Sequence, residues 1–514
     1  MVTQSEPSGP DLTQGVPATS LLDGGMISGH VGEEPVLLVR LGDDILAVSS
    51  KCTHYGGPLG EGVVSGDTVR CPWHHACFSL RTGEAIRAPA FDPVPCWRAE
   101  VLGDQIVVRE KLPTPSAETA SIQPDARFVI VGGGAAGFAA AEMLRRVGFA
   151  GELVVLSSDA ERPVDRPNLS KDFLAGKAPE SWVFLKGAKY YERRDIRLEL
   201  STTVTSLDVN TSSLRLGDGR SMTFDKLLLA TGAEPIRLSI PGADRSHVFT
   251  LRSLDDSRAI VSKAGESRNA VVVGASFIGL EVAASLIERG LSVQVVAPET
   301  RPLEKVLGSE LGDFVRAEHE AHGVVFHLGR KPAIIEDAQV VLDDGTRLNA
   351  DLVVMGVGVR PRTDLAEQAG LNVDRGVVVD AFMESSAPGI FAAGDIARFP
   401  YALAGGGSVR IEHWVVAERQ GQIAAMNMLG RREKYEQAPF FWSQHYEVPI
   451  NYVGHAEAWD STEVVGAIQE RDGLVRFRKD GRTLAVASIS RDRENLTAKL
   501  ELEGSRARAA SQAI

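Results

Sequence analysis

The chain has 514 residues, of which 44% are apolar and 24% are charged, a composition typical of globular proteins. This length is enough for about three or four domains. The net charge of −13 argues against a nucleic-acid partner, because such binding relies on Lys and Arg. No apolar run is long enough to span a bilayer, so we expect no membrane insertion. Four cysteines and no leader-like N-terminal pattern favour a cytoplasmic protein without a disulfide framework.

The N-terminal part predicts a disordered segment followed by a small all-β domain. Residues 1–20 are rich in Ser, Thr, Pro and Gly, which predicts disorder. Short β-type runs then alternate with Gly, Asp and Pro turns, as in an all-β domain. These runs are residues 35–40, 44–49, 68–71 and 105–109. We place the domain at residues 21–110 and a Pro/Ser/Thr-rich linker at residues 111–125.

Two short segments of the β domain carry candidate metal ligands. Cys52-Thr-His54 is followed, sixteen residues later, by Cys71-Pro-Trp-His74. Two thiolates and two imidazoles can hold a [2Fe–2S] cluster, with Cys on one iron and His on the other. The alternative is a structural Cys2His2 zinc site. Zinc fingers usually pair Cys with Cys, whereas each segment here supplies one Cys and one His. The pattern resembles the Rieske ferredoxins, which implies that these four residues bind a cluster.

The surroundings of these ligands depart from the Rieske proteins of respiratory complexes. Ala76 and Phe78 stand where those proteins have Ser and Tyr hydroxyls bonded to the cluster and its ligand. Gly57 and Trp73 stand where they have a disulfide pair. His75 is a spare histidine, because the C-x-x-H spacing selects the histidine before it.

The segment after the linker predicts a dinucleotide-binding strand–turn–helix unit. An apolar run ends in Gly132-Gly-Gly134-Ala-Ala136-Gly137, and helix-forming alanines follow. In such a turn Gly132 permits the tight bend, Gly134 lets a pyrophosphate approach, and Gly137 lets helix and strand pack closely. N–H groups at the helix start then face the phosphates. The alternative is an ordinary glycine-rich turn.

A second copy of this pattern makes the alternative less favoured. It has Gly274 and Gly279, with the small residue Ser276 at the middle position. Acidic residues that could bind ribose hydroxyls lie about 20 residues beyond the third glycine of each copy. They are Asp159 and Glu299. Two units imply two dinucleotides, usually a tightly held flavin and a diffusible nicotinamide.

The segment 162–171 resembles the P-Y-D-R-P-P-L-S-K motif of the ferredoxin-reductase group of FAD enzymes. The resemblance implies that Arg166 lies near the adenosine side of FAD and Lys171 near the isoalloxazine; the alternative is a solvated pair of charges. In that group the acidic ribose ligand usually sits one residue before Asp159, at Ser158. Disulfide reductases of the same fold place two cysteines beside the flavin. This chain has none there, so electrons leave the flavin by another route.

Three further motifs match the same group. An apolar strand ending in Thr231-Gly232 matches the place where the chain returns toward FAD. Another strand, with a turn at Gly358, resembles the wall near the nicotinamide. Gly394 and Asp395 match the second FAD motif, in which the Asp bonds the ribitol. A buried Asp needs such a hydroxyl or N–H partner.

Two residues of the resemblance keep an alternative assignment. Glu281 matches an acid beside the flavin and Lys171, or it compensates the charge of its helix N-terminus. Trp414 lies in a segment that the family places around the isoalloxazine, or it is plain core. Members using NADH often carry an acid at the position of Ala297. NADH is therefore favoured here only through Glu299.

The combination resembles the Rieske-bearing branch of the apoptosis-inducing-factor-like flavoproteins. It implies a multidomain fold: an all-β Rieske domain, two Rossmann-like α/β domains for FAD and NAD, and an α+β C-terminal domain. Beyond residue 125 we expect FAD-binding segments at 126–250 and 376–435, an NAD(P)H-binding domain at 251–375 and a C-terminal interface domain at 436–514.

The implied activity is that of an FAD-dependent NAD(P)H oxidoreductase of the ferredoxin–NAD(+) reductase type. Electrons would pass from NAD(P)H through FAD to the [2Fe–2S] cluster, and on to an acceptor protein or small molecule, for example in an oxygenase system. We expect a monomer or homodimer. Two alternatives remain: an NAD(P)H oxidase or quinone reductase with a regulatory Rieske domain, and a non-enzymatic redox sensor.

Overall fold

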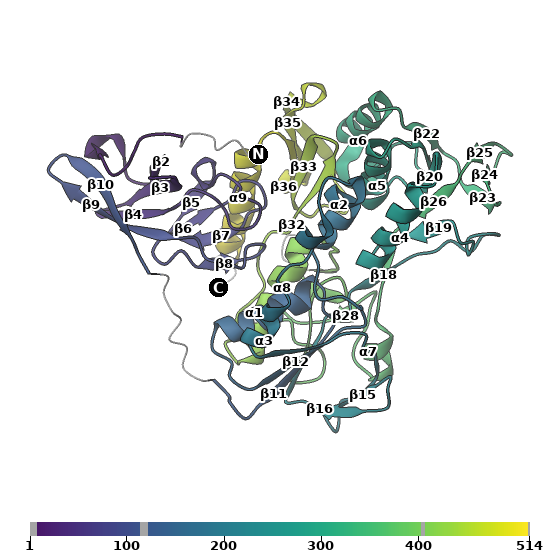
Figure 1. Ribbon diagram of the computed structural model, residues 1–514, viewed down its shortest axis with the longest axis horizontal. Coiled ribbons are helices and arrows are strands. Elements are labelled where there is room, and N and C mark those ends of the chain that lie inside the picture. The colour runs from purple at the N-terminus through teal and green to yellow at the C-terminus, as the bar shows by residue number, and fades with distance from the viewer. Residues whose placement is uncertain (1–7, 114–121, 402–406, 512–514) are drawn as a thin grey trace. The chain divides into compact units, whose positions relative to one another are not determined.

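The computed structural model describes residues 8–113, 122–401 and 407–511, and only the backbone of residues 505–511 (Figure 1). The chain forms two compact units. The first contains residues 1–120 and 491–514, and the second contains residues 121–490. Most of the predicted linker, residues 114–121, lies outside the described residues.

The first unit is built on two antiparallel sheets, as the predicted all-β domain requires. The first sheet has the order β1-β10-β9-β4-β3-β2, and the second has the order β5-β6-β7-β8. The strands are β1 (Val16–Pro17), β2 (Met26–Val31), β3 (Glu34–Leu41), β4 (Asp44–Ser49), β5 (Val63–Ser65), β6 (Thr68–Arg70), β7 (Cys77–Ser79), β8 (Ala85–Arg87), β9 (Cys96–Leu102) and β10 (Gln105–Lys111). The four predicted β runs correspond to β3, β4, β6 and β10.

Strand β3 separates two apolar cores. Successive side chains of a strand point to opposite faces. Leu37 and Val39 therefore pack in a core with Phe78, whereas Val36 and Leu38 pack in another core with other residues of the first sheet. This continuous apolar run is consistent with a strand that is covered on both faces.

The predicted disorder of residues 1–20 is wrong from residue 8 onward. Leu12 is fully buried, and its backbone N–H donates to the carbonyl of His30. The N–H of Val108 in turn donates to the carbonyl of Leu12, and Val16 pairs with Ile106. Composition misled here because a few apolar side chains suffice to fix a polar segment against a sheet.

A long C-terminal helix, α9 (Asp492–Ser511), belongs to this first unit. The carboxylate of Glu503 accepts a hydrogen bond from Arg70 at 3.0 Å and lies 3.9 Å from Arg87. The sequence predicted one C-terminal domain at 436–514. In the structure its strands belong to the second unit and its helix to the first.

The second unit contains two parallel five-stranded sheets, as the two dinucleotide motifs predict. Their orders are β13-β12-β11-β17-β29 and β19-β26-β20-β21-β22. The strands of the first are β11 (Arg127–Val131), β12 (Glu152–Leu156), β13 (Ile196–Glu199), β17 (Lys226–Leu229) and β29 (Ile390–Ala392). Those of the second are β19 (Val248–Thr250), β20 (Asn269–Val273), β21 (Ser292–Ala297), β22 (Val325–Leu328) and β26 (Leu352–Met355). Strand β29 thus joins the first sheet although it follows the second in sequence.

The helices and smaller sheets cover and connect these two sheets. The helices are α1 (Ala135–Arg146), α2 (Asp172–Ala175), α3 (Lys189–Arg193), α4 (Leu254–Ala264), α5 (Phe277–Glu288), α6 (Glu304–Ala321), α7 (Asp364–Gln368) and α8 (Trp414–Met428). The short strands are β14 (Val204–Asp208), β15 (Ser213–Leu216), β16 (Ser221–Thr223), β18 (Ala233–Pro235), β23 (Pro332–Ile335), β24 (Gln339–Leu342), β25 (Arg347–Asn349), β27 (Val359–Pro361), β28 (Val377–Val378), β30 (Ala397–Pro400) and β31 (Ser408–Val409).

An antiparallel sheet with the order β32-β33-β36-β35-β34 completes the second unit. Its strands are β32 (Phe440–His445), β33 (Val448–Gly454), β34 (Ser461–Ala467), β35 (Asp472–Lys479) and β36 (Arg482–Ile489).

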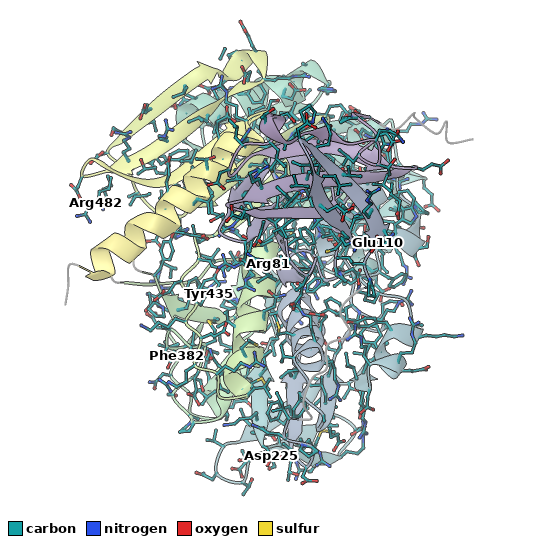
Figure 2. All side chains as sticks on the ribbon, turned by 90° about the vertical axis from the view of Figure 1, so that its left-hand side faces the viewer. Arg81, Glu110, Asp225, Phe382, Tyr435 and Arg482 are labelled. Atoms are coloured by element: carbon teal, nitrogen blue, oxygen red, sulfur yellow. The ribbon has the colours of Figure 1, made fainter. Side chains whose placement is uncertain are left out.

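The polarity of the first parallel sheet locates its binding edge. Asp225, labelled in Figure 2, accepts a hydrogen bond from the backbone N–H of Arg127 at the amino end of β11. The carboxyl ends of β11 and β12 lie at the opposite edge. In open α/β sheets ligands bind outside the carboxyl ends of the strands.

The corrected N-terminus can be tested with two leucine substitutions. Leu12→Ala should lower the free energy of unfolding of the first unit by about 2–5 kcal/mol, because it removes a fully buried side chain. Leu22→Ala is the matched control, since Leu22 is 73% exposed and its change should stay within about 0.5 kcal/mol. Urea unfolding followed through the visible absorption of the Rieske cluster measures both. Equal stabilities would contradict the packing of Leu12.

Candidate cofactor sites

The glycine turn after β11 has the geometry that a pyrophosphate requires. Gly132 has a φ of +113°, and a Cβ there would lie 2.1 Å from the carbonyl oxygen of Ala230. A Cβ on Gly137 would lie 1.9 Å from the carbonyl oxygen of Gly132, so only glycine permits this helix–strand contact. A Cβ on Gly134 would approach nothing closer than the Arg166 guanidinium, at 3.7 Å. The backbone at Gly134 is therefore open on the side where a ligand would lie.

A cavity of about 620 Å³ opens at this turn. It brings together residues that lie far apart in the sequence, from both glycine units and from the C-terminal sheet. The predicted site residues that line it are Gly132, Gly134, Ala136, Asp159, Arg166, Lys171, Thr231, Gly232, Glu281, Gly394, Asp395 and Trp414. Ser158, the alternative to Asp159, also lines it.

Two arginines pair with the acidic residues of the cavity. Arg166 lies 3.1 Å from the carboxylate of Asp159, and Arg252 forms an ion pair with Asp395. Burial, and the charge of Arg252 nearby, lower the pKa of Arg166. Two guanidinium groups in one cavity suit an anionic ligand such as a dinucleotide. Sequence analysis missed Arg252, which stands in no recognisable motif and reaches Asp395 only through the fold.

Lys171 and Glu281 meet in the cavity. The Lys171 ammonium lies 2.9 Å from Glu281 Oε2, which also accepts from Ser170 Oγ at 2.5 Å. Ser443 donates to the other oxygen of Glu281 at 2.6 Å. Glu281 is 4% exposed, and these three donors surround its carboxylate. The contacts favour the predicted pairing with Lys171 over a role confined to compensating the helix N-terminus.

Four aromatic residues belong to the lining of the cavity. Trp414, Phe277, Phe441 and Trp442 line it, and the Phe277 and Phe441 rings lie 4.9 Å apart. The imidazole of His413 lies 4.2 Å from Phe441, and burial lowers its pKa to about 3. Flat apolar rings that line the same cavity as Lys171 suit a planar heteroaromatic ring. Together with the open glycine turn, these residues fit FAD.

The second glycine turn repeats the backbone geometry of the first. Gly274 has a φ of +106°, and a Cβ on Gly279 would lie 2.3 Å from the Gly274 carbonyl oxygen. Ser276 does more than remain small. Its hydroxyl donates to the carbonyl of Gly356 at 2.7 Å and accepts from the N–H of Gly279 at 3.2 Å. The serine therefore caps helix α5.

Other residues of the nicotinamide unit lie apart from the large cavity. Glu299 follows β21 and lies 3.4 Å from Lys305, and Gly358 has a φ of +107° beside β27. Of the described residues predicted to bind dinucleotides, six do not line that cavity. They are Gly137, Gly274, Ser276, Gly279, Glu299 and Gly358.

The two candidate cluster segments form loops of matching hydrogen-bond pattern. The N–H of Cys52 donates to the carbonyl of Gly57, and the N–H of Cys71 donates to that of Ala76. In return, the residue four positions after each cysteine donates to the carbonyl of that cysteine. At this fourth position Gly56 has a φ of +77° and His75 a φ of +61°. The two loops thus present their ligands in a related way.

The four candidate ligands converge between these loops. His54 Nδ1 and His74 Nδ1 are 3.2 Å apart, and the thiols of Cys52 and Cys71 are hydrogen-bonded. Burial lowers the pKa of His54 to about 3, which keeps its imidazole in the neutral form that binds metals. His75 is 3% exposed and is not the histidine that approaches His54. The donor set fits a [2Fe–2S] cluster with two sulfur and two nitrogen ligands.

Small residues close the space around these ligands. A Cβ on Gly57 would lie 2.8 Å from Cys71 Sγ, so a larger residue at this position would crowd the thiol. Ala76 and Phe78 are fully buried, and neither carries a hydroxyl that could donate to the cluster. On the outer side, the ring of Tyr55 stacks on His54 at 3.9 Å.

Across the described residues, we find no helix with the length and hydropathy needed to cross a membrane.

Three family models match the chain. They are pyridine nucleotide-disulphide oxidoreductase over residues 126–421, Rieske [2Fe-2S] domain over residues 14–98, and reductase C-terminal over residues 440–513. These matches confirm the predicted fold class and the predicted FAD, NAD(P)H and [2Fe–2S] cofactors.

Individual relatives agree with these matches. Apoptosis-inducing factor 3 of Homo sapiens is 34% identical, with 92% of this chain and 80% of that protein covered. The anthranilate 1,2-dioxygenase system ferredoxin–NAD(+) reductase component of Burkholderia cepacia is 35% identical over 71% of this chain and 91% of its own length. A chain of the covalent putidaredoxin reductase–putidaredoxin complex superposes with a TM-score of 0.71 and 34% identity, covering 74% of this chain and 93% of that one.

Substitutions in the two glycine turns should affect the binding of different cofactors. Gly137→Ala should abolish FAD binding, because the new Cβ collides with the turn that faces the pyrophosphate. Gly279→Ala should leave FAD bound but weaken NAD(P)H binding at least about tenfold, or about 1.4 kcal/mol. Flavin absorbance per chain and titration with NADH measure the two effects. Full FAD content in the Gly137→Ala protein would contradict the assignment of the first turn.

The cluster ligands are tested by Cys71→Ser. The variant should lose the Rieske electron paramagnetic resonance signal and most of its iron, while FAD stays bound in the other unit. Cys96→Ser is the matched control, since Cys96 is another buried thiol of the same domain outside the ligand set. Iron content equal to that of the unmodified protein in Cys71→Ser would refute the assignment.

Proposed function

The chain belongs to the pyridine nucleotide-disulphide oxidoreductase family, and from this premise we propose that its own Rieske cluster is the first acceptor of its electrons. The established part is an FAD-dependent NAD(P)H oxidoreductase that transfers electrons to an iron–sulfur acceptor. The observation that carries the proposal is the fusion itself. The match to the ferredoxin reductase of Burkholderia cepacia covers 91% of that protein but 71% of this chain. The relative therefore has little length left for a Rieske domain of its own.

The residues of the large cavity have separate tasks in this reaction. FAD, when bound there, would supply the chemistry of accepting a hydride and releasing electrons one at a time. The N–H groups of the first glycine turn would bind the pyrophosphate, and Arg166 and Arg252 would offer further N–H donors to the dinucleotide. Lys171, held by Glu281, would fix the polar side of the ring site, and the aromatic residues of the lining would exclude water from the bound ring. The described cysteines all lie in the Rieske domain, so no thiol pair of this unit takes part.

We further propose that the final acceptor is an oxygenase component and that NADH is the preferred donor. The names of two relatives support the first point, the reductase component of an anthranilate 1,2-dioxygenase system and the ferredoxin reductase subunit of a 5,5'-dehydrodivanillate O-demethylase. Glu299 supports the second, because an acid at this position can bind the ribose hydroxyls of NAD. The four described cysteines form no disulfide, which supports our proposal of a reducing, cytoplasmic setting.

Anaerobic stopped-flow tests the internal transfer. With NADH, the cluster should become reduced at the rate of turnover, and an oxygenase or cytochrome acceptor should be reduced only when the cluster is present. Cys71→Ser should still accept a hydride but reduce no protein acceptor. If the cluster is reduced far more slowly than the enzyme turns over, transfer through the cluster is refuted.

Mixing variants distinguishes transfer within a chain from transfer between chains. The Cys71→Ser protein lacks the cluster, and the Gly137→Ala protein is expected to lack FAD. We expect the mixture to stay inactive if each chain serves its own cluster. Recovered acceptor reduction would rule out a path confined to one chain.

A further inference from the structure

A row of buried polar side chains runs from the large cavity through the second unit. Ser443 Oγ donates to Glu281 at 2.6 Å and lies 3.2 Å from His445 Nε2. His445 Nδ1 lies 3.1 Å from His319 Nε2, and His319 Nδ1 lies 3.3 Å from the hydroxyl of Tyr446. Ser443 and His319 are fully buried, and His445 is 1% exposed. Each link is therefore a hydrogen bond shielded from water.

The hydrogen atoms of this row have one consistent arrangement. Ser443 has a single hydroxyl hydrogen and gives it to the Glu281 carboxylate. His445 must therefore donate to Ser443 from Nε2, which leaves its Nδ1 as an acceptor. His319 then donates from Nε2 and accepts the Tyr446 hydroxyl hydrogen at Nδ1. Every donor in the row points toward Glu281.

We propose that this row conducts protons between Glu281 and the far end of the row at Tyr446. The proposal rests on the function inferred above. One hydride brings two electrons and one proton, and two one-electron transfers to clusters remove only the electrons. The balance is NAD(P)H plus two oxidised clusters giving NAD(P)⁺, two reduced clusters and one H⁺. That proton has to leave the buried site once per turnover.

The surroundings of Glu281 direct its proton into the row. Its Oε2 accepts from both Lys171 and Ser170, so a proton on the carboxyl group belongs on Oε1, which faces Ser443.

When Glu281 carries this proton, the row runs the other way: Glu281 donates to Ser443, Ser443 to His445 Nε2, His445 Nδ1–H to His319 Nε2, and His319 Nδ1–H to Tyr446. Release shifts one proton along every bond of the row. Glu281 loses its proton, each imidazole gains one on Nε2 and loses one from Nδ1, and Tyr446 gives one to solvent. The row thus has two orientations, which differ by one proton on Glu281.

Burial keeps the two imidazoles neutral, as such a relay needs. Burial, and then the charge of Lys171, lower the pKa of His445 to about 3. Burial and neighbouring imidazoles likewise hold the pKa of His319 well below its ordinary value. A neutral imidazole passes a proton by receiving it on one nitrogen and releasing it from the other.

The outer end of the row lies beside a solvent-exposed group. The ring of Tyr446 stacks on the imidazole of His322 at 3.6 Å, and His322 is exposed. Burial and the charges of Glu288 and Glu318 raise the pKa of Tyr446. Glu318 also lies 2.9 Å from Arg471. These groups, with His322, are the charges that set the proton affinity of this end.

The orientation of the row can be read from the histidine tautomers. Nitrogen-15 NMR of the FAD-loaded protein should show His319 and His445 as neutral Nε2–H tautomers. Glu281→Gln imitates the protonated acid, because its amide oxygen must face Lys171 and its NH₂ group must face Ser443. Both histidines should then shift to the Nδ1–H tautomer. Identical tautomers in the two proteins would overturn the coupled row, whatever the fate of the electrons.

Proton release itself is measured with a pH indicator during stopped-flow oxidation of the NADH-reduced protein by ferricyanide, which needs no Rieske cluster. Tyr446→Phe and His319→Gln should slow proton release at least about tenfold and increase its solvent deuterium effect. The equilibrium potential of the flavin should not move, because a relay alters rates only. Proton release as fast as in the unmodified protein in both variants would refute the proposal.

Tyr452→Phe is the matched control for Tyr446→Phe. Tyr452 is also a buried tyrosine of the C-terminal sheet, and its hydroxyl accepts from the N–H of Ala456 outside the row. If the row had only a structural role, the Tyr446→Phe and His319→Gln proteins would melt at lower temperatures, but the solvent deuterium effect on proton release would not change. A failed transfer to the Rieske cluster would leave the ferricyanide experiment unaffected, so the two proposals fail separately.

Discussion

The contact on which the second unit depends most is the buried ion pair between Lys171 and Glu281. Lys171 lies between β12 and β13 of the first parallel sheet in sequence, and Glu281 lies on helix α5 beside the second. Ser443, which completes the carboxylate shell, lies in the C-terminal sheet. A buried charge left without its partner is strongly destabilising. The pair therefore holds three parts of the unit in one arrangement and places a polar group in the lining of the cavity.

Local patterns predicted the fold class and many of the residues that line the candidate cavity. The two glycine turns and the Cys-x-His and Cys-x-x-His spacings are short enough that each reports one strand–turn–helix or one loop. The steric requirement for glycine is also local, because a Cβ on Gly137 would collide with the carbonyl oxygen of Gly132 in the same turn. Ser276 shows the limit of such reasoning. Its small size was recognised from the sequence, but its hydroxyl also donates to the carbonyl of Gly356, which follows a distant strand.

Contacts between distant segments could not be predicted from the sequence. Arg252 reaches Asp395 only because the chain returns to the first sheet after the second is complete. The row from Ser443 to Tyr446 needs His319, which lies on helix α6 and has no motif around it. For residues 8–20 the sequence led to an incorrect prediction instead of a missed contact. Their polar composition predicted disorder, whereas the burial of Leu12 in a core of the first unit orders this segment.

The late return of the chain also has a consequence for biosynthesis. Strand β29 pairs with β17 across the whole NAD(P)H-binding segment, and Gly421 of α8 packs so closely on α1 that a Cβ would lie 2.1 Å from the Ala136 carbonyl. Such pairing of distant segments is slow, because the loop-closure entropy must be met before the contacts form. On the ribosome, the nicotinamide-binding half can fold first. The flavin-binding half keeps an unpaired edge at β17 until β29 and then α8 have emerged. Supply of FAD at that moment would favour the closed sheet by mass action, so flavin scarcity should expose nascent chains to chaperones and proteases.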